Sequence, residues 1–331
     1  MNWSAIFDNT FREMFSINAI AFALAAIGLN VHFGYTGLLN FGQVGFMAIG
    51  AYGVAIPMGT YGWSPLPALL VGVAASVALA LILGIPTLRL RADYLAIVTI
   101  ATAEIIRLLA RSVPLRGFAG GSSGINEFAE PFYRWNPFDP QTFYGFGPFR
   151  YLGNELWMML AGWALVAVIS VAVWLLIRSP WGRVVKSIRE DEDAARSLGK
   201  NAYWYKLQAL ILGGVIGGVA GMVLGIARQT VQPDAYANAV TFFVWTALIL
   251  GGVGKVWSPI VGSMLFWMLL GFTDTALREA VDAGVISRSL LDGVKIGQVR
   301  FILIGLGLAA LMVFRPQGVF GNRNEMALDD R

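Results

Sequence analysis

Two oppositely charged side chains, Glu104 and Arg107, stand inside a strongly apolar stretch of the sequence. The stretch predicts a membrane-spanning helix from about Asp93 to Arg111. At ~1.5 Å per residue, Glu104 would lie near the middle of a hydrocarbon layer about 30 Å thick. Charges at that depth are costly and face a polar interior, and side chains three residues apart share a helix face. Either a structural ion pair or part of a pathway for a zwitterionic solute would explain both residues.

A second polar group, without charge, lies in residues 34–43, GYTGLLNFGQ, between two apolar stretches. Its glycines indicate a chain break. The break is either an aqueous turn or a helix broken inside the bilayer, where the freed backbone groups line a cavity or meet other protein groups. In the second interpretation, four side chains join Glu104 and Arg107 as candidate pathway residues: Tyr35, Thr36, Asn40 and Gln43.

Residues 178–206 form a charged island with seven Lys or Arg and four acidic side chains. Pro180 favours a helix start and Gly199 a helix stop, so we expect one polar helix between them. The excess of positive charge places this segment on the cytoplasmic side of a membrane. Charge alone favours a solvated loop, and a docking helix for a partner is the alternative.

The elements that must position these residues follow from composition. Of 331 residues, 57% are hydrophobic and only 13% are charged, which is typical of a polytopic helical membrane protein. We expect one all-α transmembrane domain over residues 1–331, with about nine spans (eight or ten are alternatives). Its other expected parts are an interfacial segment, 1–16, an extracytoplasmic loop, 113–153, and a cytoplasmic tail, 315–331.

Two glycine patterns give the expected helices further detail. A stripe with a spacing of four residues indicates close helix packing in lipid: Gly213, Gly217, Gly221 and Gly225. The sequence GGVGKVWSP, 251–259, interrupts a second apolar region. This interruption is the counterpart of the break at 34–43. Paired interrupted segments are typical of a transport pathway.

Several kinds of chemistry are excluded or disfavoured by the sequence. The chain has no cysteine and one histidine, His32, so we expect no metal site. Hydrolase and zinc-protease motifs are missing, and Gly254-Lys255 lacks the Ser or Thr of a phosphate-binding loop. We therefore expect a non-catalytic chain that binds neither ATP nor another cofactor.

The charged island also carries a family motif. Asp193, Ala194 and Ala195, followed by three residues and then Gly199, resemble the E-A-A-x-x-x-G element of ABC importer permeases, with Asp in place of Glu. The flanking residues resemble the LivM-type branch of the branched-chain amino acid ABC transporter permeases. Further blocks resemble that family in the same order: 35–52, 93–107, 120–125, 250–254 and 314–321.

This resemblance implies an inner-membrane ABC importer permease fold with broken helices. It would import branched-chain amino acids or related small polar solutes by alternating access. The implied partners are a LivH-like permease subunit in a heterodimer, an extracytoplasmic solute-binding protein and two cytoplasmic ATPase subunits that hold ATP and Mg²⁺, and no nucleic acid is expected. The residues alone also allow a self-sufficient secondary transporter or channel.

The same resemblance makes residues 178–206 the coupling segment to an ATPase. Small residues would allow a partner to approach closely, namely Ala194, Ala195 and Gly199. Charged side chains would set the orientation of that partner, namely Arg183, Lys186, Asp193 and Arg196.

Overall fold

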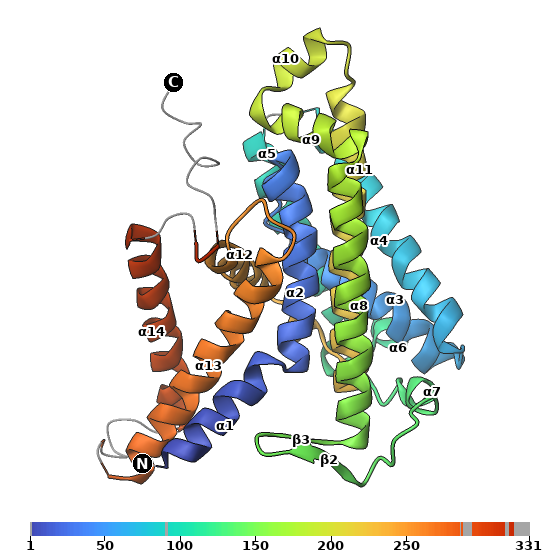
Figure 1. The fold of residues 1–331 in the computed structure, drawn as a ribbon. Coiled ribbons are helices and arrows are strands. Elements are labelled where there is room, and N and C mark those ends of the chain that lie inside the picture. The colour runs from blue at the N-terminus through green and yellow to red at the C-terminus, as the bar shows by residue number, and fades with distance from the viewer. Residues whose placement is uncertain (1, 90–91, 285, 287–292, 315–317, 321–331) are drawn as a thin grey trace.

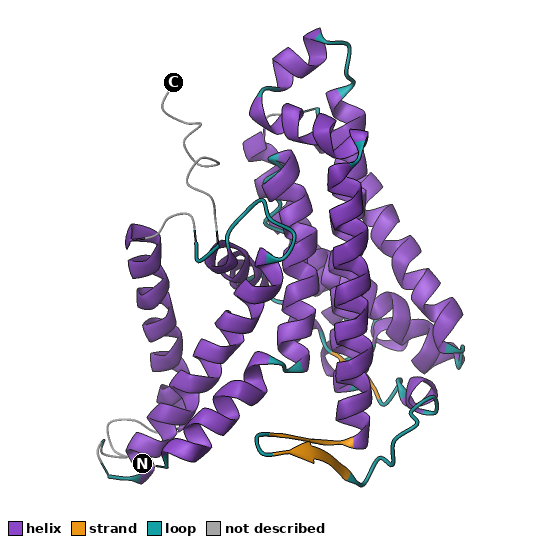
Figure 2. Ribbon diagram, viewed as in Figure 1, coloured by secondary structure: helices purple, strands orange, loops and turns teal. Residues whose placement is uncertain are grey.

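The computed structural model describes residues 2–89, 92–284, 286, 293–314 and 318–320, and helices make up most of them (Figure 2). The all-α prediction is confirmed. The helices are α1 (Trp3–Met14), α2 (Ile17–Leu29), η1 (Asn30–Tyr35), α3 (Gln43–Tyr61), α4 (Pro65–Thr87), α5 (Ala92–Arg111), α6 (Arg116–Ala119), η2 (Gly121–Ser123), α7 (Glu130–Tyr133), α8 (Gly153–Arg178), α9 (Pro180–Glu190), α10 (Glu192–Ser197), α11 (Ala202–Arg228), η3 (Pro233–Tyr236), α12 (Ala239–Gly251), α13 (Ser258–Asp282) and α14 (Gly293–Phe314).

Six helical stretches within the described residues are long and apolar enough to cross a membrane. They are Trp3–Tyr35, Gln43–Tyr61, Pro65–Thr87, Gly153–Arg178, Ala202–Arg228 and Ser258–Asp282. The first of them joins α1, α2 and the π-helical η1, with a break after α1 where Ser16 caps α2 by accepting from the Ala19 amide. The expected total of about nine spans would add α5, α12 and α14, and it stays a prediction.

Helix α11 lies at the centre of the bundle, in contact with α2, α3 and α4. Its glycines make these contacts possible because a Cβ at each would collide with a neighbour. Gly213 lies against His32, Gly217 against Gln43, Gly221 against the Met47 carbonyl and Gly225 against Val231. Since association in lipid depends on packing of small residues, this stripe brings the backbones of α2 and α3 onto α11.

Helices α9 and α10 lie at one end of the bundle, and the hairpin β2–β3 lies at the opposite end (Figure 1). The hairpin pairs β2 (Phe143–Phe146) with β3 (Phe149–Leu152). A second sheet pairs β1 (Ile125–Asn126) with β4 (Thr230–Val231) and ties segment 113–153 to the end of α11. The placement of that segment outside the cell stays a prediction.

Tyr133 in α7 provides another anchor for segment 113–153. Its hydroxyl donates to the Ile226 carbonyl at 3.3 Å, and burial raises the pKa of Tyr133 to about 12. The hydroxyl therefore keeps its proton at any physiological pH, and segment 113–153 stays hydrogen-bonded to α11.

The expectation of one polar helix between Pro180 and Gly199 is wrong. α9 does begin at Pro180, but it ends at Glu190, and α10 starts after an extended Asp191. Asp191 caps α10 by accepting from the Ala194 amide at 2.9 Å. Four consecutive acidic residues oppose the dipole of a helix C-terminus and favour that of an N-terminus, so a new helix begins among them.

The expected cytoplasmic tail, 315–331, lies outside the described residues except for 318–320. That short piece packs against the end of α12, where the Val319 amide donates to the Leu250 carbonyl at 2.9 Å. The Lys255 ammonium donates to the Phe320 carbonyl at 2.6 Å.

Candidate functional site

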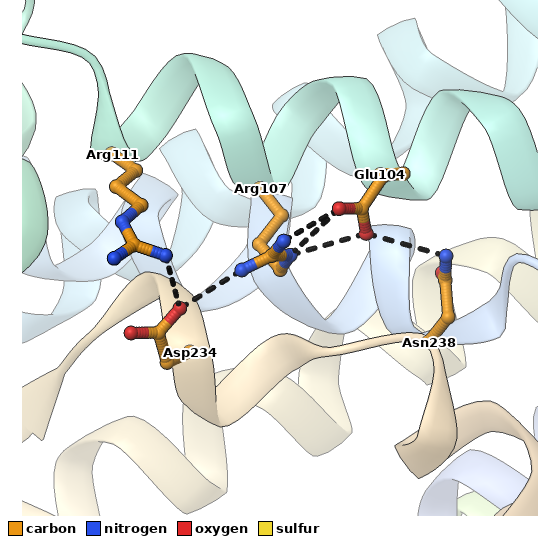
Figure 3. Close-up of polar contacts among 5 residues, drawn as sticks. All are labelled: Glu104, Arg107, Arg111, Asp234 and Asn238. Atoms are coloured by element: carbon orange, nitrogen blue, oxygen red, sulfur yellow. Dashed lines mark hydrogen bonds and ion pairs between the residues drawn. The ribbon is translucent and has the colours of Figure 1, made fainter.

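The Glu104–Arg107 pair belongs to a larger charged cluster made of Glu104, Arg107, Arg111, Asp234 and Asn238 (Figure 3). Arg107 binds both carboxylate oxygens of Glu104, with Nη2 at 2.5 Å from Oε1 and Nε at 3.1 Å from Oε2. Its Nη1 donates to Asp234 Oδ1 at 2.9 Å, and Arg111 Nη1 reaches the same oxygen at 3.4 Å. Asn238 donates to Glu104 Oε2 at 3.3 Å. The formal charges of the two arginines and the two carboxylates therefore sum to zero.

Two separate parts of the chain position this cluster. Glu104, Arg107 and Arg111 are three and four residues apart on α5, so they line one helix face. Asp234 lies in η3, the short connection from α11 to α12, and Asn238 directly precedes α12. The cluster therefore connects α5 to the α11–α12 junction.

The members of the charged cluster differ in how firmly they are held. The Arg107 side chain is 17% exposed and the Asp234 side chain 59%. Exposed ion pairs contribute only about 0–1 kcal/mol, whereas bidentate Arg–carboxylate pairs are stronger. The long Arg111–Asp234 contact is therefore the first that a competing ion would replace. Asn238 Oδ1 is buried and accepts no hydrogen bond from the described residues.

This arrangement suits recognition of both charges of a small zwitterion. A carboxylate could take the place of Asp234 beside Arg107 and Arg111, and an ammonium could bind Asp234 and Asn238 Oδ1. Within the described residues, no group of three or more His, Asp or Glu side chains could hold a metal ion.

A second polar group, which we call the polar break, fills the chain break between α2 and α3 and consists of His32, Asn40 and Gln43. All three side chains are fully buried. Asn40 Nδ2 lies 3.0 Å from His32 Nδ1 and donates to Gln43 Oε1 at 2.8 Å. His32 Nε2 lies 3.1 Å from the Leu210 carbonyl. Gln43 Nε2 donates to the Gly213 carbonyl and to the Ala25 carbonyl, each at 3.3 Å.

Surrounding elements satisfy the backbone that the break releases. Thr99 of α5 accepts from the Phe41 amide at 3.1 Å, and Thr241 of α12 accepts from the Val44 amide at 3.0 Å. Trp245 donates its indole N–H to the Asn40 carbonyl at 3.0 Å. The segment 34–43 is thus a helix broken inside the protein, and the alternative of an aqueous turn is wrong.

The two interrupted regions touch each other directly. Asn30 Oδ1 accepts from the Gly254 amide, and Asn30 Nδ2 donates to the Lys255 carbonyl, both at 3.0 Å. The break at 34–43 and its counterpart at 251–259 are therefore joined through one side chain at the start of η1.

The predicted pathway residues fall into two places. Glu104 and Arg107 lie in the charged cluster, which is partly open. Asn40 and Gln43 lie in the polar break, and Tyr35 and Thr36 are buried in the same segment. Thr36 donates to the Val31 carbonyl at 2.9 Å. A pathway role for the four residues of segment 34–43 stays a prediction.

The predicted coupling residues lie mostly on the surface of α9 and α10. Asp193 has a 95% exposed side chain, and Arg183, Lys186, Ala194, Arg196 and Gly199 are exposed as well. Ala195 differs, since it is 3% exposed and packs on Ile188 and Ala202. Its small side chain lets α10 pack against α9, and because it is buried there it is not available for contact with a partner. The Lys206–Glu192 ion pair also ties α10 to α11.

Sequence reasoning missed Asp234, Asn238 and Arg111, because Asp234 lies 127 residues from Arg107 in the chain. No local pattern marks such a contact. For Arg111, its position four residues beyond Arg107 on the same helix face was an available signal.

Helices broken inside the fold, a charged cluster beside them and an exposed charged segment at one end define a polytopic membrane transport protein. The family described as "Branched-chain amino acid transport system / permease component" matches residues 12–291. The high-affinity branched-chain amino acid permease protein LivM of Escherichia coli K12 is 31% identical over 310 residues, which are 90% of this chain and 67% of that protein.

Two further relatives extend this comparison. The permease protein LivH of the same organism is 26% identical over 309 residues, 91% of each chain. The nucleoside ABC transporter permease protein NupC of Lactococcus lactis is 27% identical over 257 residues, 73% of this chain and 74% of that protein. No solved structure gives a significant match.

The chain belongs to the branched-chain amino acid transport system permease family. It is a permease subunit of an ABC importer in the inner membrane, as the sequence motifs predicted. The alternative of a self-sufficient secondary transporter or channel finds no support among the relatives.

Proposed function

We propose that this chain forms part of the import pathway for branched-chain amino acids or related small polar solutes. Its partners would be a LivH-like permease subunit, an extracytoplasmic solute-binding protein and two ATPases that bind ATP and Mg²⁺, while this chain binds no cofactor and catalyses no reaction. The LivM relatives favour this solute class. The observation that carries the proposal is the balanced, partly open charged cluster, since it matches the paired charges of an amino acid.

In this proposal, Glu104 and Arg107 line the pathway, and Arg111, Asp234 and Asn238 complete the solute contacts. The bidentate Arg107–Glu104 pair keeps the guanidinium oriented. An entering carboxylate would first displace Asp234 from Arg111, because that contact is long and exposed. The neutral total charge means that a zwitterion could enter without leaving an uncompensated charge.

The coupling to ATP hydrolysis would pass through α9 and α10. The exposed residues Ala194 and Gly199 would allow an ATPase surface to approach, and Arg183, Asp193 and Arg196 would orient it. Gly199 has φ +75° and open space around it, so a side chain there would strain the backbone and project outwards.

Alternating access would then require the interrupted helices to change their packing. Tyr35, Thr36, Asn40 and Gln43 are buried in the present conformation. They would meet a solute only if the polar break opened, whereas the charged cluster is already accessible. We therefore place the four residues of segment 34–43 further along the pathway than Glu104 and Arg107.

Co-purification tests the coupling part of this proposal. A tagged chain, co-expressed with its permease partner and ATPases, should retain the ATPases in detergent, and Gly199→Trp and Asp193→Lys should lose them. Glu130→Gln, an exposed change in segment 113–153, is the matched control and should retain them. Full retention in both Gly199→Trp and Asp193→Lys would contradict the assignment of α9 and α10 as the ATPase contact.

A further inference from the structure

The face of α9 that is turned toward the bundle contacts the π-helical segment η1 at the start of the chain break. Arg189, near the end of α9, donates from Nη1 to the Gly34 carbonyl, which lies 155 residues away in the sequence. One turn earlier, the Lys186 ammonium lies 5.7 Å from the centre of the Tyr35 ring. Two cationic side chains of α9 therefore hold the end of η1.

The hydrogen bond from Arg189 has a structural cause on the η1 side. The regular hydrogen-bond ladder ends here, because the Gly37 amide donates to the Phe33 carbonyl and the Leu38 amide to the His32 carbonyl. The Gly34 carbonyl is buried at this point, and a buried carbonyl without a donor is costly. A charged donor such as guanidinium satisfies it more strongly than a neutral one.

Backbone contact strengthens this joint. A Cβ placed on Gly37 would lie 3.4 Å from Arg189 Cγ and 3.9 Å from both Cα and Cβ of Arg189. The glycine has φ +73°, so the chain turns directly against the arginine stem. α9 and the end of η1 are thus packed as well as hydrogen-bonded.

From η1 the contacts continue into both interrupted regions. Asn30 at the start of η1 joins the 251–259 interruption through Gly254 and Lys255. His32 in the middle of η1 is itself a member of the polar break, and its Nδ1 lies 3.0 Å from Asn40 Nδ2. A displacement of η1 would therefore move both breaks together, while α9 is the element that reaches η1 from the exposed end of the bundle.

We propose that Arg189 is a positioning residue for transport, which makes α9 and η1 move as one body and so transmits movement of the coupling segment to the two broken helices. The inference rests on the proposed role of α9 and α10 in ATPase contact. It adds a residue that faces away from the ATPase and would act after docking.

The first test measures ATP hydrolysed per solute imported, in vesicles that contain the complete complex. Arg189→Met should raise this ratio about tenfold, the effect of losing roughly one charge-assisted hydrogen bond, while ATPase retention stays normal. Arg189→Lys, which keeps a cationic donor, should restore part of the coupling. An unchanged ratio in Arg189→Met, with the wild type coupled, would overturn the inference and leave the proposed function intact. A wild-type complex that imports without ATP would instead overturn the proposed function.

The second test replaces the hydrogen bond between α9 and η1 by a disulfide bond. The chain has no cysteine, and the 3.9 Å separation of the Cβ positions of residues 37 and 189 lies within the range of about 3.5–4.5 Å that disulfides require. The double variant Gly37→Cys with Arg189→Cys should be uncoupled when reduced and regain coupling when oxidised. Arg189→Cys alone, which has no second cysteine in this chain to pair with, is the control and should stay uncoupled under both conditions. A cross-linked protein that remains uncoupled, or that stops importing, would show that α9 and η1 must separate and would overturn the inference.

Discussion

The charged cluster and the polar break are both polar groups inside an apolar bundle, but they are built in opposite ways. The polar break is neutral and fully buried, and its side chains bond to one another and to backbone carbonyls of α2 and α11. The charged cluster has formal charges, partly exposed side chains and one buried oxygen that accepts no hydrogen bond from the described residues. The polar break is therefore suited to holding helices in place, and the charged cluster to exchanging its contacts for those of a solute.

The largest effect is expected from Gln43→Leu in the polar break. The change removes the hydrogen bonds to Asn40, Ala25 and Gly213 while the site stays buried. Each buried group left without a partner costs about 1–3 kcal/mol, so most of the expressed protein should fail to fold. The yield and melting temperature of the detergent-purified permease measure this. A wild-type melting temperature in Gln43→Leu would contradict the structural role of the polar break, and with it the contrast with the charged cluster.

Glu104→Gln in the charged cluster should behave in the reverse manner. The side chain keeps its size, so the yield of folded protein should stay close to wild type. Solute uptake by the complete complex should fall about tenfold or more, which corresponds to roughly 1.4 kcal/mol, because Arg107 loses its compensating charge. Normal uptake would favour a purely structural ion pair.

Asp234→Asn should have a smaller effect of the same kind. Its carboxylate is more exposed than Glu104 and makes single contacts to Arg107 and Arg111. Exposed pairs contribute about 0–1 kcal/mol, so uptake should decrease by roughly threefold. Initial uptake rates over a range of solute concentrations give the measurement, and a loss as large as that of Glu104→Gln would place the solute contact at Asp234.

The smallest effect is expected from Glu130→Gln, which breaks an ion pair with Arg134 outside both groups. The two side chains are 72% and 70% exposed. Such a pair contributes at most about 1 kcal/mol, so uptake and melting temperature should both stay within experimental error. A marked loss of uptake would mean that segment 113–153 takes part in transport through a contact of its own.

Local features of this fold could be predicted from the sequence, because their causes are local. Spacing on one helix placed Glu104 beside Arg107, the glycines of segment 34–43 marked a break, and Pro180 marked the start of α9. The division of the charged island at Asp191 could also be predicted, since an acidic residue that caps a new helix is a local signal.

The contacts that give the two groups their character could not be predicted in this way. Asp234 reaches Arg107 across 127 residues, and Asn30 reaches Gly254 across 224. Such pairs depend on how α5, α11 and α12 pack in three dimensions, and periodicity along one helix carries no information about them.

We expect this chain to move a solute only when external ATPases drive it. Uptake should be measured in vesicles that contain this chain and its permease partner, with and without the ATPases, in the presence of the solute-binding protein and ATP. We expect uptake only with the ATPases, and inhibition of that uptake by vanadate. Solute accumulation by the two permease chains alone, driven by an ion gradient without ATP, would contradict it.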